Sequence, residues 1–281
     1  MAGKLVLVSG ATGQQGGAVA RNLLNAGFSV RGMTRKPDGD AAKALAGLGA
    51  EIVKGDLDDA ASVEAAMKGA WGAFSVQNTW EAGVEKEEAQ GKKFADLAKK
   101  AGIQHLVYSS VGSANRNTGV PHFDNKARVE KHIAGLGLPS YVVLRPVFFM
   151  ENMKTFFPPD ENGNINMAMS PSTKLQMVAV KDIGKYGLLA FEKASELNGQ
   201  AIDFAGDSLT IPEAAAIIAA KTGKTVKHVQ ADIEAVRAYS DDMAKMFEWF
   251  DSTGYNCDIA SQQSKYGIKP TSFTEWVASA F

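Results

Sequence analysis

The chain is poor in cysteine, in net charge and in long apolar runs, and each shortage excludes a class of protein. Cys257 is the single cysteine among 281 residues, so no disulfide can form within the chain and a reducing, cytoplasmic setting is expected. The 30 Lys and Arg residues nearly balance 31 Asp and Glu, which argues against a nucleic-acid-coating surface. No apolar stretch approaches the ~20 residues that cross a bilayer. We therefore expect neither nucleic acid nor a membrane as a partner.

The remaining composition is that of an ordinary globular protein. Apolar residues make up 45% and charged residues 22% of the chain, which excludes disorder as its main character. The length exceeds the ~100–200 residues of a usual domain, so we expect one large domain or one domain with a smaller lobe. Met1–Lys4 run straight into a strand-like segment, which leaves no room for a signal peptide. Cys257 is either an inert structural thiol, which we favour because no basic residue adjoins it, or a reactive one.

Strand-like and helical stretches alternate through the first half of the chain. Strands are expected at residues 4–9, 29–34, 51–54, 70–76, 104–109 and 140–144. Helices are expected at residues 14–25, 41–48, 60–67, 84–101 and 125–135. This alternation predicts right-handed βαβ units. The expected fold is α/β, a Rossmann-type doubly wound parallel sheet with helices on both faces.

The alternation stops after Arg145-Pro146. Residues 156–173 collect Pro, Gly, Asn and Ser, which predicts turns and a short hairpin. Helices are expected further on, near residues 183–193, 211–221, 233–238 and 241–250. We therefore divide the chain into a Rossmann domain at 1–150 and a smaller, mostly helical C-terminal lobe at 151–281, some of whose segments return to the sheet.

A glycine-rich turn, Gly10 to Gly16, lies directly between the first strand and the first helix. Gly10 permits the sharp turn, Gly13 lets a pyrophosphate approach the positive end of the helix, and Gly16 lets helix and strand pack closely. The alternative is a βα turn with no ligand. We favour a dinucleotide site because the position, the spacing and the flanking patterns agree.

The end of the second strand indicates which dinucleotide binds. NAD-preferring sites hold an acid there for the ribose 2′-hydroxyl, whereas this strand ends in Thr34-Arg35-Lys36. The Arg35 guanidinium can bind a 2′-phosphate and stack on adenine. NADP(H) is therefore favoured over NAD(H), with a solvated basic turn as the alternative. Asp56 follows the third strand and either accepts a hydrogen bond from the adenine amino group or caps the next helix.

The fifth strand ends in Ser109-Ser110, and His122 and Lys126 follow, four residues apart and so on one face of a helix. This arrangement resembles the short-chain dehydrogenase/reductase superfamily, which has a Ser at this strand end and a Tyr-x-x-x-Lys motif on the next helix. The resemblance implies that Lys126 bonds the nicotinamide ribose. His122 stands in place of the tyrosine, so carbonyl reduction is in doubt. An imidazole can act as a general acid, or His122 is a helix N-terminal residue without chemistry.

Further motifs resemble the NmrA-like family of atypical short-chain dehydrogenases/reductases, and most of all its NADPH sensors. The motifs are GATGQQGGAVARNLL from Gly10, TRKP, GDLDD, NTWE, HFDNK, FFMEN, DDMAKMFEWF and FTEW. The resemblance implies a set of cofactor contacts at Gly10, Thr12, Gly13, Gln14, Gln15, Gly16, Arg35, Asp56, Leu57, Asn78 and Lys126.

The same resemblance implies that Phe149, Met150, Glu151 and Asn152 close over the nicotinamide. One feature departs from the sensors, which carry a further basic residue on the long helix at 84–101. Ala89 stands at that position here, and either Lys86 or Lys92 is expected to substitute for it.

Two functions of different classes follow. The first is a sensor or regulator that responds to the NADPH/NADP⁺ ratio. The second is an NADPH-dependent reductase of small apolar acceptors (quinones, enones or aromatic dyes), with Lys126 placing the cofactor, His122 donating a proton, and Ser110 or Ser109 bonding the acceptor. A scaffold-like role with a regulatory protein partner is a third, weaker alternative. No metal is expected, and the sequence leaves the oligomeric state open, a homodimer included.

Overall fold

The structure, a computed structural model, describes residues 3–281 and divides them into two units. The first unit comprises residues 3–111, 125–145 and 183–202, and the second comprises 112–124, 146–182 and 203–281. Each unit draws on three stretches because the chain crosses between the two units several times. The sequence placed one boundary after residue 150, with returns to the sheet; in the structure, residues 183–202 belong to the first unit and residues 112–124 to the second.

The first unit is built on a seven-stranded sheet with the strand order β10-β6-β5-β4-β1-β2-β3. Its strands are β1 (Leu5–Val8), β2 (Ser29–Thr34), β3 (Glu51–Lys54), β4 (Gly72–Ser75), β5 (His105–Ser109), β6 (Tyr141–Pro146) and β10 (Ala201–Phe204). The neighbours from β3 to β6 pair in parallel. On β1, Val6 lies opposite Val30 on one side and Gly72 on the other. The order reverses at β1, as expected for a doubly wound sheet.

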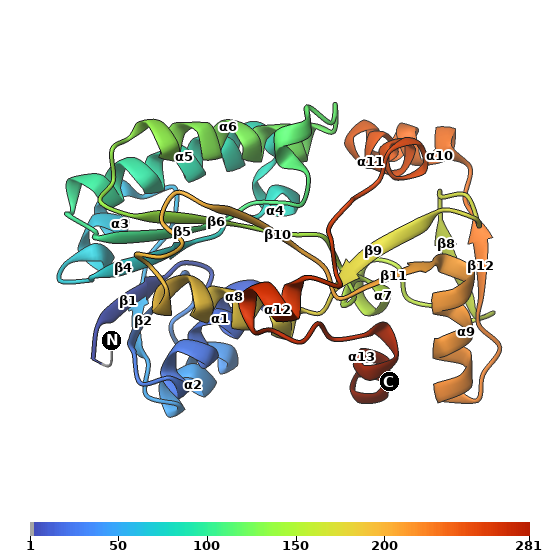
Figure 1. The fold of residues 1–281 in the computed structure, drawn as a ribbon, viewed down its shortest axis with the longest axis horizontal. Helices are drawn as coiled ribbons and strands as arrows, with labels where there is room; N and C mark the ends of the chain where they lie inside the picture. The colour runs from blue at the N-terminus through green and yellow to red at the C-terminus, as the bar shows by residue number, and fades with distance from the viewer. Residues whose placement is uncertain (1–2) are drawn as a thin grey trace. The chain divides into compact units, whose positions relative to one another are not determined.

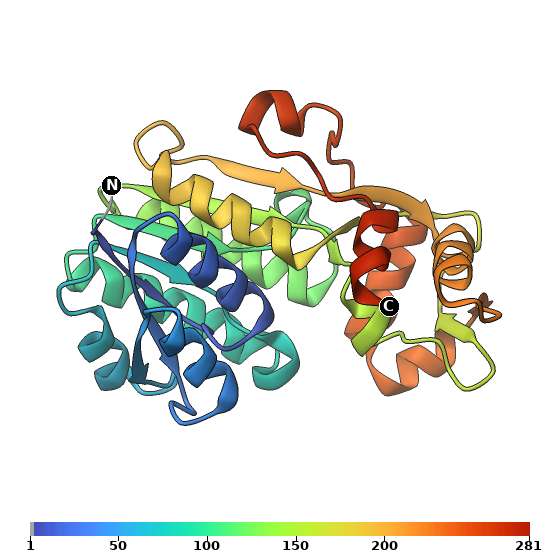
Figure 2. The same cartoon turned by 90° about the horizontal axis from the view of Figure 1, so that it is seen from below.

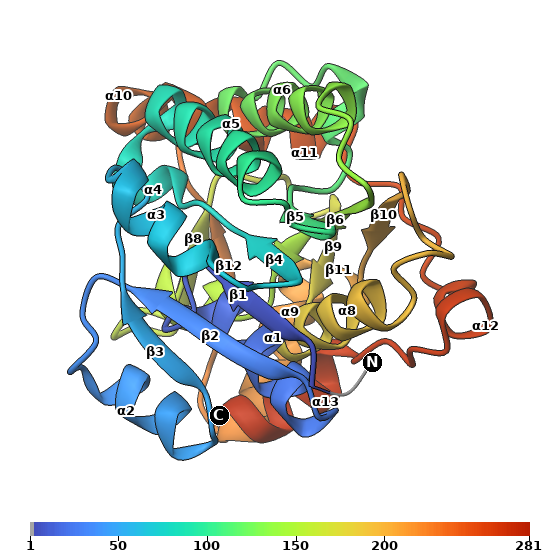
Figure 3. The same cartoon turned by 90° about the vertical axis from the view of Figure 1, so that its left-hand side faces the viewer.

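Helices cover both faces of this sheet (Figures 1 and 3). One face carries α3 (Ala60–Met67), α5 (Val84–Lys100) and α6 (Pro121–Gly135), and the other carries α1 (Gln14–Asn25), α2 (Asp40–Gly47) and α8 (Val180–Glu192). The short helix α4 (Thr79–Ala82) precedes α5. A core of Leu, Val, Ala and Met side chains, together with Phe94, lies between the sheet and the layer formed by α3, α5 and α6. The expected α/β fold with two helical layers is confirmed.

The layer on the opposite face, formed by α1, α2 and α8, depends on a close approach between α1 and α8. These two helices lie side by side in Figure 2. A Cβ on Gly184 would meet the backbone of Ala18, and a Cβ on Gly187 would meet the Val19 side chain. The two glycines therefore let α8 pack against α1, which begins at the glycine turn.

The second unit contains two small sheets, of order β11-β9-β7 and β12-β8. Its strands are β7 (Phe148–Phe149), β8 (Asn164–Met167), β9 (Lys174–Val178), β11 (Asp207–Thr210) and β12 (Lys227–Gln230). Its helices are η1 (Ala114–Arg116), α7 (Asn152–Thr155), α9 (Ile211–Thr222), α10 (Ile233–Tyr239), α11 (Asp241–Ser252), α12 (Gln262–Tyr266) and α13 (Phe273–Ala280). The predicted helices at 211–221, 233–238 and 241–250 all form, so this C-terminal region is largely helical.

The hairpin expected within residues 156–173 does not form. The segment contains one strand, β8, which pairs in parallel with β12, while β9 begins after it and pairs with β11 and β7. Turn residues such as Pro158 and Gly163 correctly predicted that regular secondary structure is interrupted here. They could not identify β12, some 60 residues away, as the partner of β8.

No helix within residues 3–281 combines the length and the apolar character needed to cross a membrane.

Candidate functional site

The glycine turn after β1 has the backbone that its sequence predicted. Gly10 adopts a φ of +57°, a conformation that L side chains rarely take. A Cβ on Gly16 would collide with the backbone oxygens of Gly10 and Ser9, and one on Gly13 would lie 3.3 Å from the Gly10 oxygen. Gly16 therefore lets the first turn of α1 lie directly on the end of β1.

The N-terminus of α1 has no side-chain cap. Gly13 is the N-cap residue, and no side chain accepts a hydrogen bond from the first turn. The first backbone N–H groups of a helix lack partners within the helix and carry its positive dipole end. Gln15 is held toward the sheet, where its Oε1 accepts a hydrogen bond from the Ser109 hydroxyl at 2.6 Å. The start of α1 can therefore bind an anion.

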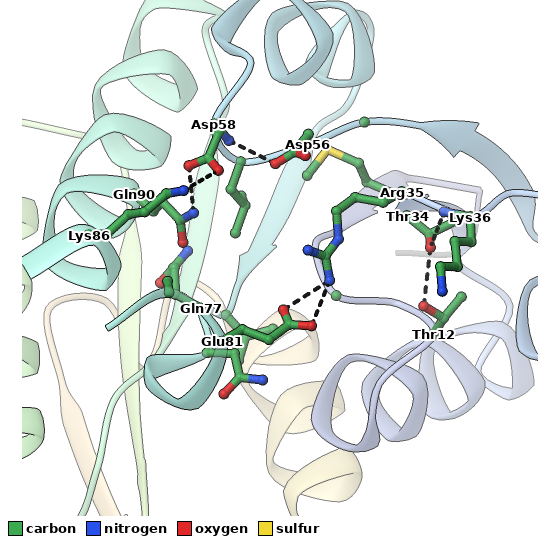
Figure 4. A pocket seen from close by; sticks show the side chains of 17 residues that line it. Thr12, Thr34, Arg35, Lys36, Asp56, Asp58, Gln77, Glu81, Lys86 and Gln90 are labelled. Carbon is green, nitrogen blue, oxygen red and sulfur yellow. Dashed lines mark hydrogen bonds and ion pairs between the residues drawn. The ribbon is translucent and has the colours of Figure 1, made fainter. Parts of the chain in front are cut away.

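A cavity of about 300 Å³ lies beside this turn, at the carboxyl ends of β1, β2, β3 and β4 (Figure 4). Six predicted cofactor residues line it, Gly10, Thr12, Arg35, Asp56, Leu57 and Asn78. The other lining residues are Met33, Thr34, Lys36, Gly55, Asp58, Val76, Gln77, Glu81, Ala82, Lys86 and Gln90. All of them belong to the first unit. Gly13, Gln14, Gln15 and Gly16 lie outside the lining, at the start of α1.

Arg35 points from the end of β2 toward α4, where it meets Glu81 (Figure 4). Its Nη2 donates to both carboxylate oxygens of Glu81, at 2.8 and 2.9 Å. The hydrogen bond and the charge of Glu81 raise the pKa of Arg35 above its ordinary value. Both side chains are more than half exposed, at 60% and 56%. The sequence has no acid at the end of β2, but the fold brings an acid from α4, Glu81, to the same place.

A second ion pair closes the other side of the cavity. The Lys86 ammonium lies 2.7 Å from Asp58, and the Gln90 side-chain amide donates to the same carboxylate at 2.8 Å. These two hydrogen bonds hold the pKa of Asp58 below its ordinary value. Of the two lysines proposed to substitute at the Ala89 position, Lys86 lines the cavity. Lys92 pairs with Glu88 instead.

Three further predicted residues support the walls of the cavity. Thr12 and Thr34 share a hydrogen bond of 3.2 Å between their hydroxyls. Asn78 caps α4 by accepting a hydrogen bond from the Trp80 backbone. Asp56 accepts from the Asp58 backbone, and α3 is capped by Asp59. Capping of the next helix, one of the two roles considered for Asp56, is therefore wrong, and the contact with adenine stays a prediction.

Lys126 lies on α6 and pairs with a buried acid. Its ammonium is 2.5 Å from the Glu87 carboxylate, and their side chains are only 12% and 2% exposed. Glu87 also accepts hydrogen bonds from Asn125 and from the Thr79 hydroxyl. Burial alone would raise the pKa of Glu87, but the Lys126 charge and these hydrogen bonds hold it below its ordinary value.

Ser110, at the end of β5, is likewise bonded to an acid. Its hydroxyl donates to Glu130 on α6. The Arg145 guanidinium binds the same carboxylate through Nε at 3.0 Å and Nη2 at 2.5 Å. Arg145 and Glu130 are both nearly buried, with side chains 9% and 11% exposed. Ser110 therefore belongs to a buried polar cluster.

His122 lies in the second unit, at the start of α6, and is held by Asp242. Its Nδ1 is 2.8 Å from both carboxylate oxygens of Asp242 at the start of α11, and its backbone N–H donates to the same group. The ring also packs edge-on against Phe123. Asp242 therefore fixes the orientation of the imidazole, as carboxylates do for catalytic histidines.

The segment Phe149–Asn152 also lies in the second unit, and none of its residues lines the cavity. Met150 is fully buried. The Glu151 carboxylate accepts from the Val180 backbone and, at 3.0 Å, from the Trp276 indole. Burial raises the pKa of Glu151 above its ordinary value. These contacts are internal to the second unit, and closure of the segment over a nicotinamide stays a prediction.

The lone thiol is partly buried and only weakly acidic. Cys257 donates to the Asp203 carbonyl oxygen, and burial raises its pKa to about 12, so almost no thiolate forms near neutral pH. In the described part of the chain, no cluster of His, Cys, Asp and Glu has the arrangement of a metal site.

The functional residues that the sequence missed are the acids that hold the predicted ones. Glu81, Glu87, Glu130 and Asp242 each bind a side chain to which the sequence assigned a role. Glu81 belongs to the NTWE motif and Asp242 to the DDMAKMFEWF motif, so a signal was present for each of them. For Glu87 and Glu130, only the fold brings the partners together.

Two relatives set this chain among known proteins. An NmrA-like family domain-containing protein of Dictyostelium discoideum is 29% identical over 98% of this chain and 97% of its own length. The NmrA-like family domain-containing oxidoreductase FrzB of Cladobotryum sp is 38% identical over 53% of this chain. The second match covers 47% of FrzB, so the chain spans about half the length of that relative.

Solved structures share the fold over the whole chain. The negative transcriptional regulator NmrA, in complex with NADP, has a TM-score of 0.80 at 22% identity and matches 100% of this chain and 96% of its own. NmrA has also been solved with NAD. An NADPH-dependent quinone oxidoreductase of Escherichia coli has a TM-score of 0.79 at 22% identity, with 98% of both chains covered.

The motifs that suggested a family are distributed along the chain, from the glycine turn to the FTEW sequence of α13. The model of the NmrA-like family matches residues 2–277, which is nearly the full length. This chain therefore belongs to the NmrA-like family.

Proposed function

We propose that this chain binds NADP(H) and acts as a sensor or regulator that responds to the NADPH/NADP⁺ ratio. The uncapped N-terminus of α1, opened by Gly10, Gly13 and Gly16 beside a cavity of about 300 Å³, carries the proposal. Backbone N–H groups at a helix end are suited to a pyrophosphate. NmrA, which has the same fold and has been solved with NADP and with NAD, supports this assignment.

The residues present fit such a dinucleotide. The first turn of α1 would hold the pyrophosphate, and Asp56, Leu57 and Asn78 would surround the adenosine half. Arg35 and Lys36 supply positive charge for a 2′-phosphate. Lys126 gives one of its three ammonium donors to Glu87, so donors remain for the ribose hydroxyls. When bound, the cofactor supplies a hydride.

The choice of a sensor rests on what binds two of the candidate catalytic side chains. Lys126 is neutralised by buried Glu87, and the Ser110 hydroxyl donates to Glu130. The tyrosine of the short-chain dehydrogenase/reductase superfamily is absent, and the Ser110 hydroxyl already donates its proton to Glu130. These groups bind and orient more readily than they transfer protons.

The test is a titration of the purified protein with NADPH, NADP⁺, NADH and NAD⁺ by calorimetry, with light scattering and limited proteolysis of each complex. A sensor must bind the two redox forms with different affinity or in different states, because equal binding shifts no equilibrium. Equal affinities, oligomer sizes and cleavage patterns with NADPH and NADP⁺ would defeat the sensor.

A pair of glycine variants locates the site. Gly16→Ala should abolish dinucleotide binding, because its Cβ has no room against Gly10 and Ser9. Gly47→Ala, on α2 with no atom within 4 Å of the added Cβ, should bind as the parent does. Undiminished binding by Gly16→Ala would remove the glycine turn from the proposal.

The second candidate is an NADPH-dependent reductase of small apolar acceptors such as quinones, enones or aromatic dyes. The observation that favours it is the bond between His122 Nδ1 and Asp242, which orients the imidazole as in a general acid. A panel of acceptors, followed at the nicotinamide absorbance band, tests it. No NADPH consumption above background excludes a reductase of these acceptors, and turnover that survives His122→Phe excludes His122 as the proton donor.

A regulator must act on another molecule, and we propose that this is a regulatory protein partner or a second copy of the chain. We propose a cytoplasmic setting, because a chain with a single cysteine cannot form a disulfide within itself. Light scattering of the apo and NADPH-bound forms measures the homodimer directly, and a monomer in both forms would leave only the protein partner.

A further inference from the structure

Glu81 lines the cavity next to Arg35. Because Arg35 is assigned to the 2′-phosphate, we expect the 2′ substituent of the adenosine ribose to lie close to this acid. Glu81 reaches Arg35 from α4, whereas the usual acid of an NAD site follows β2 in the sequence. Both Glu81 oxygens accept from Arg35 Nη2, and both residues line the cavity. Arg35, one of the two cations assigned to a 2′-phosphate, is therefore already bonded to a carboxylate within the same cavity.

The other charged residues that line the cavity are Lys36, Asp56, Asp58 and Lys86. Lys86 is bound to Asp58 on the other wall. Arg35 is the single ion-pair partner of Glu81 within residues 3–281. A phosphate that bound the remaining Nε and Nη1 donors of Arg35 would bring a like charge close to Glu81, which is unfavourable. Because Glu81 is more than half exposed, it can turn into water when that happens.

A 2′-hydroxyl has the opposite effect. It is neutral and can donate a hydrogen bond to a carboxylate, which only accepts. With NAD(H), the contact between Arg35 and Glu81 can therefore persist while Glu81 accepts from the ribose. The same acid opposes a cofactor with the 2′-phosphate and favours one without it.

We infer that Glu81 is a specificity-determining residue that competes with the 2′-phosphate for Arg35 and so sets the preference between NADP(H) and NAD(H). This inference deepens the proposed function and rests on the dinucleotide site described there. Release of Glu81 is then the local change that accompanies binding of NADP(H), and α4, a helix of four residues capped by Asn78, is the element that it frees.

The experiment compares Glu81→Gln with the parent by calorimetric titration of NADP⁺ and NAD⁺. Loss of the competing charge should raise the ratio of NADP⁺ to NAD⁺ affinity by roughly 5- to 20-fold, because an exposed ion pair and one like-charge contact are removed. Glu51→Gln is the matched control: Glu51 pairs with Arg31 at 2.8 Å and is similarly exposed, but it lies outside the cavity lining. It should leave the ratio unchanged.

The fragments 2′,5′-ADP and 5′-AMP, which differ only in the 2′-phosphate, should reproduce the change without a nicotinamide. Arg35→Gln provides the second half of a mutant cycle. In that background Glu81→Gln should give a smaller gain for NADP⁺, because no guanidinium is left to compete for.

The outcomes separate the two proposals. If the parent binds neither dinucleotide, the proposed function fails and this inference fails with it. If the parent binds NADP⁺ but Glu81→Gln changes the ratio no more than Glu51→Gln, the inference alone fails. If Glu81→Gln raises NADP⁺ affinity equally in the parent and in Arg35→Gln, Glu81 acts through its charge alone. It then does not compete with the 2′-phosphate for Arg35, and the inference is overturned.

Discussion

Arg35 and Lys126 are both cations that the sequence assigns to the cofactor, and both are paired with a glutamate, but their surroundings differ. The side chains of Arg35 and Glu81 are 60% and 56% exposed, whereas those of Lys126 and Glu87 are 12% and 2% exposed. An exposed pair exchanges partners at little cost. A buried pair is costly to break, because the remaining charge has no water around it. The comparison teaches that Lys126 is a fixed part of the fold and that Arg35 is free to exchange its partner.

The largest expected effect comes from breaking the buried pair. Glu87→Gln leaves the Lys126 ammonium buried without a counter-charge and should lower the free energy of unfolding by about 3–5 kcal/mol. Urea unfolding followed by circular dichroism measures it. Removing the stranded charge as well, in Glu87→Gln combined with Lys126→Met, should recover part of the loss. If Glu87→Gln lowers the free energy of unfolding by less than about 1 kcal/mol, the buried pair contributes no more than an exposed pair does.

The second buried pair extends the comparison. Glu130→Gln removes the charge that Arg145 faces and should cost about 2–3 kcal/mol. Ser110→Ala deletes one hydrogen bond to the same carboxylate and should cost about 1 kcal/mol. If the two variants unfold at the same urea concentration, burial of the ion pair is not what distinguishes this cluster.

Acid should weaken the buried pair before it affects the Glu87→Gln variant. The pKa of Glu87 lies below its ordinary value of 4.5, so its charge contributes stability above that pH and the contribution is lost as pH falls through the lowered pKa. Glu87→Gln lacks this group. The free energy of unfolding of the parent should therefore fall more steeply than that of the variant as pH decreases below 4.5. Parallel curves from pH 7 to pH 3 would contradict this linkage.

The smallest effect is expected at the exposed pair. Glu81→Gln should change the free energy of unfolding by less than about 0.5 kcal/mol, because an exposed pair in water gains little over its hydrated parts. A loss above about 1.5 kcal/mol at Glu81 would mean that its pair with Arg35 supports the fold, and the contrast with Lys126 would disappear.

Local patterns in the sequence were sufficient to predict most of the first unit. The helix at 14–25 and the strands at 29–34 and 51–54 form with the predicted bounds, because periodicity and glycine positions are local signals. The helix that carries His122 begins at Pro121, four residues earlier than predicted. Proline is favourable in the first turn of a helix, a signal that was present but not used.

The rest depended on long-range pairing. The partner of β8 is β12, and nothing within residues 156–173 identifies it. Likewise, the sequence located Arg35, Ser110, Lys126 and His122, but not the acids that bind them. Those acids are 20 to 120 residues away along the chain, and this protein has many other acidic residues. Only the packing of α4, α5, α6 and α11 selects the ones that matter.

The raised pKa of the partly buried Cys257 has a practical consequence. A thiol with a pKa of about 12 is deprotonated in roughly one molecule in 10⁴ at pH 8, so maleimide reagents should leave it unmodified in the folded protein. A cysteine introduced on the exposed side of α4 would then take a fluorophore selectively, with the native thiol left in place. The dye would report departure of this helix from Arg35 in real time.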